Sequence, residues 1–511
     1  MTTEMYAPCP IRGLKALRHT IYGSLSILSG TPGHKPIGRL GAKVKPAPSG
    51  ASATALVWLA LAILLIATTR AWAAPGASPD DGSQVTKHCL DEPVFGGRAC
   101  TYEANPSASD VVVLVHGING SALEDWVHQI PVLAKKYHVL TFDLPGFGDS
   151  DKGNRAYTPA NYARFVHFVT TRYARGRFVL VGHSMGAAIA LYYAATYPQD
   201  LKGLVLIDAA GVLYPLSLTV YSAGAWLDDV RDVSPDEPNV LGRVVGKVLE
   251  KVERLPFDPQ SAINTREGRN LFLNGSPTRI AALALAYEDF SALLDQVTVP
   301  VLVIWGSHDT VAPLRTGRVL AARLRDARLK VVDGADHMSM REHPEIVNRM
   351  LTDYLRQPSP PQPPPKWEEQ PPDTERDGAC HNRSGIVYTG RYRHLEIDSC
   401  RDIVVRDAWI DHITVRGSRV RIRDTSIVSA GTALYATGSE VTVTNSRIKG
   451  RTAVRASGSR LDIANGELVA ARAAVEAGRK SNVVFSVSRI VSQYNHGAIH
   501  QFVTVTPDRP L

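Results

Sequence analysis

Six short apolar runs rich in β-branched residues recur between residues 110 and 334, and longer amphipathic segments separate them. The six runs begin at Val111, His138, Arg177, Leu201, Val299 and Ala327. Continuous apolar strands separated by helices are typical of a parallel sheet that is covered on both faces. The sequence therefore predicts an α/β domain over residues 84–355. The alternation breaks at about residues 212–290, where we expect a helical cap.

A possible nucleophile lies between the third run and a helical segment, in the sequence Gly182-His183-Ser184-Met185-Gly186. The serine of a G-x-S-x-G turn lies on a tight strand-to-helix connection, where bulk at either glycine position would collide with the chain. A nucleophilic serine needs a base, and the base needs an orienting carboxylate. Asp309 ends the fifth run and His337 follows the sixth, at the strand ends where open α/β sheets assemble their sites. We expect Ser184 to attack, His337 to act as base and Asp309 to orient it.

Other polar residues in these loops are alternatives for parts of this site. Asp208 follows the fourth run and is a rival carboxylate to Asp309. We interpret three further residues as structural or surface groups: His308, Asp336 and His343. Asp143 is interpreted as a carboxylate that fixes a turn.

An oxyanion that develops during acyl transfer needs backbone N–H donors. One is expected from Met185, which follows the nucleophile at the start of a helix. The other is expected from Ile118, in the loop after the first run, where His116-Gly117 would shape the loop.

Five motifs occur in a fixed order: His116-Gly117, Asp143-x-x-Gly146-x-Gly148-x-Ser150, Gly182–Gly186, Gly306-x-x-Asp309 and His337. Together they resemble the α/β-hydrolase superfamily over residues 84–355. The resemblance implies a Ser–Asp–His triad, an oxyanion hole with two donors, a helical cap and no metal or organic cofactor. A serine nucleophile departs from the dehalogenase and epoxide-hydrolase branches, which use Asp. Met338 departs from the C–C hydrolase branch, which typically has Trp after the triad His.

We therefore expect an exported serine hydrolase that cleaves carboxylic esters of small molecules or lipids through an acyl-enzyme intermediate. Two alternatives stay open. The same triad could cleave C–C or amide bonds, or the chain could be a cell-envelope binding module with an accessory hydrolase domain. An esterase activity that is lost in Ser184→Ala would distinguish the ester hydrolase from the binding module.

Residues 1–74 have the features of a targeting segment. A basic leader precedes an apolar run at Ala55–Thr68, which is shorter than the roughly 20 residues of a spanning helix. Ala71-Trp72-Ala73 then matches the small-x-small pattern of signal-peptidase sites. We predict a signal peptide or anchor that contacts the membrane at least transiently. The mature chain would be periplasmic, secreted or membrane-anchored outside the cytoplasm.

Four of the five cysteines fall into two local pairs, Cys89 with Cys100 and Cys380 with Cys400. Disulfides are expected in an exported protein, and a turn at Phe95-Gly96-Gly97 could fold the first pair together. Metal binding is the rival interpretation, but the chain has no C-x-x-C motif to support it.

A proline-rich linker at residues 356–373 separates the α/β domain from a repetitive segment, residues 374–511. Similar sequences start at Gly417, Gly438, Gly458 and Lys480. Each has alternating apolar residues and Gly, Ser or Asn corners, and a period near 20 residues favours a right-handed parallel β-helix. A β-sandwich with coincidental spacing is the alternative, and it would also be all-β.

The net charge of +8 is concentrated at the two ends of the chain. The first 50 residues carry +6 and residues 374–511 carry +7, so the part between them is mildly acidic. We therefore expect no nucleic-acid partner. Arg419, Arg421 and Arg423 alternate with apolar positions and should point outward. A solvated face explains them most simply, and an anionic envelope polymer is a possible partner.

Overall fold

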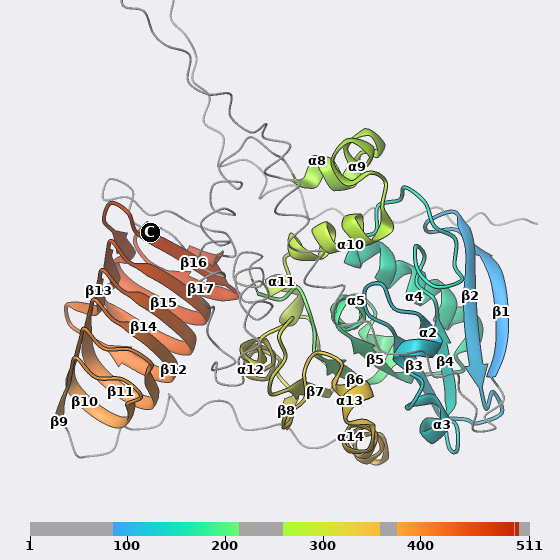
Figure 1. Ribbon diagram of the computed structural model, residues 1–511, viewed down its shortest axis with the longest axis horizontal. Helices are drawn as coiled ribbons and strands as arrows, with labels where there is room; N and C mark the ends of the chain where they lie inside the picture. The colour runs from blue at the N-terminus through green and yellow to red at the C-terminus, as the bar shows by residue number, and fades with distance from the viewer. Residues whose placement is uncertain (1–84, 214–258, 358–375, 495, 500–511) are drawn as a thin grey trace, which may run out of the picture. The chain divides into compact units, whose positions relative to one another are not determined.

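The computed structural model describes residues 85–213, 259–357, 376–494 and 496–499 (Figure 1). The predicted leader, residues 1–74, lies outside the described residues, as does the predicted linker beyond residue 357. Within the described ranges, no helix has both the length and the apolar character needed to cross a membrane.

A mixed sheet of eight strands forms the centre of the first part of the chain, in the order β1-β2-β4-β3-β5-β6-β7-β8. Its strands are β1 (Val85–Glu92), β2 (Gly97–Ala104), β3 (Val111–Val115), β4 (His138–Phe142), β5 (Phe178–His183), β6 (Leu201–Ile207), β7 (Val301–Gly306) and β8 (Ala327–Val332). The strands from β4 to β8 are parallel, while β1 and β2 form an antiparallel hairpin at one edge. All six apolar runs are thus strands of one sheet, as predicted.

Helices cover both faces of this sheet. The described helical segments are α2 (Ala122–Asp125), α3 (Ile130–Leu133), α4 (Pro159–Tyr173), α5 (Met185–Thr196), η2 (Pro198–Asp200), α8 (Pro259–Asn264), α9 (Arg266–Leu273), α10 (Pro277–Ala286), α11 (Ser291–Leu294), α12 (Leu314–Arg323), α13 (Ser339–Glu342) and α14 (Pro344–Arg356). Successive side chains of a strand point to opposite faces. Val113 therefore belongs to the core formed with α4 and α5, and Leu114 belongs to the core formed with α3 and α14.

The insertion between β6 and β7 is helical where the structure describes it. Helices α8 to α11 follow one another there, and the described residues of the insertion contain no strand. The rest of the predicted cap, residues 214–258, lies outside the described ranges.

Both predicted disulfides are present. The register of the β1–β2 hairpin places Cys89 directly opposite Cys100, so the turn between the strands brings the first pair together. Cys380 is bonded to Cys400 in the second part of the chain.

The second part of the chain is all-β, as predicted. Its strands are β9 (Arg376–His381), β10 (Val387–Asp398), β11 (Ile403–Arg416), β12 (Arg419–Val428), β13 (Thr432–Thr437), β14 (Glu440–Ser457), β15 (Arg460–Ala477), β16 (Asn482–Ser486), β17 (Ser488–Val491) and β18 (His496–Ile499). The sequence repeats pair in parallel register: Val420 with Val441, Val441 with Leu461, and Leu461 with Val483.

The predicted β-helix needs correction, because four of these strands close into a small parallel barrel. β11 pairs with both β12 and β13, and β14 also pairs with both, so the four strands form a ring. Each of β11 and β14 is long enough to pair with two strands in succession. β11 and β14 continue through Asp407 and Asn445, at φ 49° and 47°, whereas the repeats predicted short strands separated by corners. The spacing predicted which strands are neighbours, but not that one strand would pair with two others in succession.

Arginine side chains of this domain pair with glutamates across neighbouring strands. The pairs are Arg416–Glu396, Arg419–Glu440, Arg447–Glu467 and Arg455–Glu476. The charges of these four arginines are therefore compensated locally.

Candidate active site

Ser184 lies in the tight turn between β5 and α5, with the strained dihedrals φ 52° and ψ −118°. Neither flanking glycine has room for a side chain. A Cβ on Gly182 would lie 2.3 Å from the carbonyl oxygen of Gly186. A Cβ on Gly186 would lie 2.2 Å from the carbonyl oxygen of Val115 on β3. Close packing of backbone against backbone thus holds the serine in a conformation that L-residues rarely adopt.

Gly186→Ala should destabilise the protein, although the same change inside a helix normally stabilises by about 1 kcal/mol. The added methyl group meets backbone atoms that cannot rotate away, so the turn must distort. We expect a lower melting temperature and less soluble protein by thermal denaturation and expression assay. Gly431→Ala is the matched control, because a Cβ there meets nothing within 4 Å. Equal behaviour of the two variants would contradict the packing argument.

Ser184, His337 and Asp309 form a continuous chain of hydrogen bonds. Ser184 Oγ lies 2.9 Å from His337 Nε2, and His337 Nδ1 lies 2.9 Å from Asp309 Oδ2. The other oxygen of Asp309 accepts hydrogen bonds of 2.8 Å from the N–H groups of Val311 and Ala312. The three side chains are 5%, 7% and 0% exposed, respectively. The structure therefore brings together the three residues that the sequence selected from three separate loops.

Burial of these residues favours a neutral imidazole in His337. Burial lowers the pKa of His337, and nearby carboxylates, Asp208 first among them, oppose that shift. Burial raises the pKa of Asp309, while the N–H of Ala312 donates to its carboxylate and opposes the rise. A neutral His337 whose Nδ1–H donates to Asp309 has an unprotonated Nε2, which can accept the proton of Ser184.

Asp208, the rival carboxylate, bonds to other groups. Its Oδ1 accepts the N–H of Gly306 at 2.8 Å, and its Oδ2 accepts the hydroxyl of Ser339 at 2.6 Å. Burial, followed by the charge of Asp309, raises the pKa of Asp208 to about 7. This carboxyl group joins β6, β7 and α13, and its hydrogen-bond partners do not include the imidazole of His337.

The two expected N–H donors lie on segments that meet at Ser184. Met185 is the first residue of α5, so its N–H has no partner within the helix. Ile118 follows Gly117, and a Cβ on Gly117 would lie 3.2 Å from the Cβ of Ser184. His116 accepts the N–H of Leu144 at Nε2, which holds this loop against the loop after β4.

The first part of the chain is similar to known proteins. The family described as alpha/beta hydrolase fold matches residues 110–344. Residues 110–344 have the α/β-hydrolase fold. The chain is 27% identical over 255 residues to a 2-hydroxy-6-oxononadienedioate/2-hydroxy-6-oxononatrienedioate hydrolase of Cupriavidus pinatubonensis. The aligned region covers 49% of this chain and 88% of that relative. It is also 27% identical over 271 residues to monoacylglycerol lipase abhd6-B of Xenopus laevis, with 50% and 78% covered. Among solved structures, an esterase of Thermogutta terrifontis matches with 23% identity and a TM-score of 0.39, over 53% of this chain and 98% of that one.

The α/β-hydrolase domain also contains a buried pair that sequence reasoning did not select. His183 Nε2 lies 2.9 Å from the carbonyl oxygen of His337, and its Nδ1 lies 3.4 Å from Asp125. Asp125 in turn accepts the N–H of Gly117 at 2.8 Å. These contacts tie the nucleophile turn to the loop of His337 and to the loop of Ile118. His183 lies inside the G-x-S-x-G motif and could have been noticed there, whereas no motif marks Asp125.

The remaining carboxylates that were interpreted as structural bond to loops of the α/β-hydrolase domain. Asp143 accepts the N–H groups of Ala122 and Asp149 and the hydroxyl of Tyr102. Asp336 accepts hydrogen bonds from Thr310 and from the N–H of His337. Where the structure describes the chain, no group of three or more His, Cys, Asp or Glu side chains could hold a metal ion.

Proposed function

We propose that the α/β-hydrolase domain is a serine hydrolase that cleaves carboxylic esters. The observation that carries the proposal is the hydrogen-bonded chain from Ser184 Oγ through His337 to Asp309. Asp309 and His337 follow β7 and β8, and Ser184 follows β5, at the carboxyl ends of parallel strands where such sites are assembled.

In the acylation step, Ser184 Oγ attacks the carbonyl carbon of the ester while His337 Nε2 takes the hydroxyl proton. The carbonyl oxygen becomes an oxyanion, for which we propose the N–H groups of Met185 and Ile118 as donors. Collapse of the tetrahedral intermediate breaks the bond to the alcohol oxygen, and His337 returns the proton to the leaving alcohol. Water then repeats the sequence on the acyl-enzyme. Asp309 orients the imidazole and stabilises its charged form throughout.

The cap residues that the structure describes bear on access to this site. Thr278 of α10 donates a hydrogen bond to the side chain of Asn119, which follows Ile118. This contact brings the described part of the cap next to the loop of the proposed oxyanion hole.

Cleavage of C–C bonds by the same three residues is the second candidate. Similarity to the Cupriavidus oxo-acid hydrolase favours it, and Met338 in place of the Trp expected after the triad His weakens it. The full chain should be assayed against p-nitrophenyl esters of increasing acyl length and against a 2-hydroxy-6-oxodienoate, with Ser184→Ala as the blank. Turnover of the esters supports the first candidate, and turnover of the oxodienoate alone would replace it with the second.

Ester hydrolysis should lose activity at acid pH as His337 is protonated. Because burial lowers the pKa of His337 from 6.5, the neutral and active form should persist to a pH below 6.5. A plot of log kcat/KM against pH should be flat near pH 7.5 and fall with unit slope only below pH 6.5. Asp208→Asn should leave the midpoint unchanged. A midpoint near 7 that disappears in this variant would assign the titration to Asp208 instead.

We propose in addition that the protein is exported. The two disulfides support this, because such bonds persist in oxidising compartments. Fractionation of cells that produce the full chain should find it outside the cytoplasm, and a wholly cytoplasmic protein with four free thiols would refute the proposal.

A further inference from the structure

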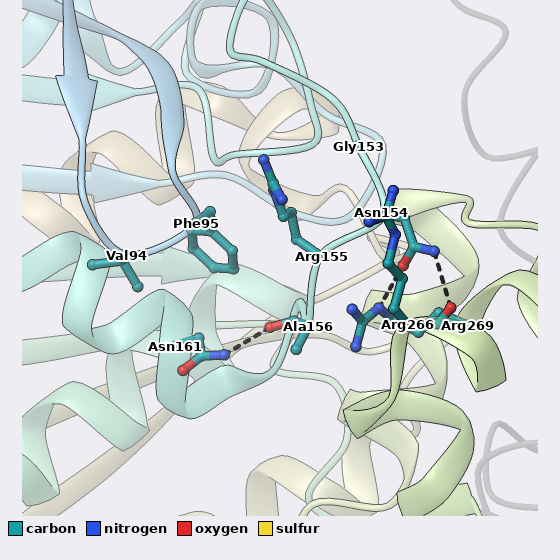
Figure 2. Close-up of a pocket in the computed structure, with 9 residues that line it drawn as sticks. All are labelled: Val94, Phe95, Gly153, Asn154, Arg155, Ala156, Asn161, Arg266 and Arg269. Atoms are coloured by element: carbon teal, nitrogen blue, oxygen red, sulfur yellow. Dashed lines mark hydrogen bonds between the residues drawn. The ribbon is translucent and has the colours of Figure 1, made fainter.

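A basic cavity of about 410 Å³ lies where the β1–β2 turn, the loop after β4 and cap helix α9 come together (Figure 2). It is lined by Val94, Phe95, Gly153, Asn154, Arg155, Ala156, Asn161, Arg266 and Arg269. This set includes none of Ser184, His337 and Asp309. The cavity is therefore built from a different set of residues from the proposed catalytic site.

Three guanidinium groups line the cavity, one from the body of the domain and two from the cap. Arg155 comes from the loop after β4. Arg266 and Arg269 lie on α9, next to Asn154 of that loop (Figure 2). Arg269 is 7% exposed and fixed in place, because it donates to the side chain of Asn154 and to the carbonyl oxygen of Ile263.

These three arginines form a cluster of positive charge. Arg155 donates to the carbonyl oxygen of Gly96, and among the described residues none of the three arginines has a carboxylate within ion-pair distance. Burial lowers the pKa of Arg269, Glu267 opposes the shift, and the charges of Arg155 and Arg266 add to it. Three like charges around one cavity repel one another, so an anion between them would relieve that repulsion.

The rest of the cavity wall is apolar or amide in character. Phe95 packs on Tyr157 with ring centroids 5.3 Å apart, and Phe95 and Val94 form the apolar part of the wall. The side-chain amide of Asn161 donates to the carbonyl oxygen of Ala156, and this hydrogen bond joins α4 to the loop after β4 (Figure 2). The cavity thus combines guanidinium donors on one side with an apolar surface on the other.

We propose that this cavity binds a phosphate group, held between Arg155 of the body and Arg266 of the cap. Guanidinium groups match the oxygens of phosphate in geometry as well as in charge, and a doubly charged anion satisfies more than one of them. The apolar wall would accommodate the organic part of a phosphate monoester. Since the two arginines belong to different segments, a bound phosphate would also join α9 to the body of the domain.

Calorimetric titration of the full chain with phenyl phosphate and with inorganic phosphate, at constant ionic strength, tests the proposal. Arg155→Gln or Arg266→Gln should each raise the Kd about tenfold or more, because each removes charge-assisted hydrogen bonds. Both residues are exposed, so these variants should fold and melt as the unaltered protein does. Arg349→Gln, an exposed arginine on α14, is the control and should bind normally.

The two ligands distinguish the possible sources of the phosphate. Tighter binding of phenyl phosphate assigns the cavity to organic monoesters, and equal binding assigns it to free phosphate. Binding should also slow amide hydrogen exchange in α9, residues 266–273. The double variant, which combines Arg155→Gln with Arg266→Gln, should lose this protection. Absence of saturable binding, or equal affinity in the unaltered protein and the double variant, would overturn the proposal.

Discussion

Replacement of Ser184 by alanine should lower kcat/KM for carboxylic esters by at least ~10³-fold. The hydroxyl is the group that forms the acyl-enzyme, and its hydrogen bond to His337 Nε2 is the route by which its proton leaves. Initial rates with p-nitrophenyl butyrate would measure the loss. Ser107→Ala, at an exposed serine, is the matched control and should retain full activity.

His337→Ala should cost about as much as Ser184→Ala, and the double variant should be little worse than either single one. Residues that act as one unit show such non-additive losses. Losses that simply multiply would mean that Ser184 and His337 act independently, which contradicts the proposed mechanism.

Asp309→Asn should lower kcat by roughly 10³- to 10⁴-fold while leaving the protein folded. The amide oxygen can still accept the N–H groups of Val311 and Ala312, so the loop is preserved. The amide NH₂ would then face Nδ1 of His337 and favour the tautomer that carries its proton on Nε2. That tautomer cannot accept the proton of Ser184.

Asp208→Asn is the matched control for this loss and should change kcat by only a few-fold. Its carboxyl group has a pKa raised to about 7, so it is substantially protonated at neutral pH. An asparagine can accept the N–H of Gly306 and donate to the hydroxyl of Ser339 in its place. If Asp208→Asn were the damaging change and Asp309→Asn the mild one, Asp208 would be the acid of the site.

Sequence periodicity was sufficient to predict the six parallel strands β3 to β8 of the α/β-hydrolase domain. A run such as Val111–Val115 is apolar at every position because its side chains enter two cores, one on each face of the sheet. The positions of Ser184, Asp309 and His337 followed from strand order, because the carboxyl ends of parallel strands meet at one edge.

Contacts between distant loops could not be predicted in the same way. Asp125 reaches His183 and the N–H of Gly117 through tertiary packing, and no local spacing marks it. The cavity arginines show the same limit, since Arg155 and Arg266 are far apart in sequence and each resembles an ordinary exposed residue. In the all-β domain the repeat predicted parallel neighbours, but the closure of a barrel depends on β11 and β14 each pairing with both β12 and β13.

Covalent labelling tests the central claim most directly. The full chain should be treated with phenylmethylsulfonyl fluoride, digested and analysed by peptide mass spectrometry. We predict one stoichiometric adduct on Ser184, loss of ester turnover in proportion to labelling, and strongly slowed labelling in His337→Ala because the base that activates the hydroxyl is gone. An adduct on another residue that accompanies inactivation, or full esterase activity in protein labelled at Ser184, would contradict the account.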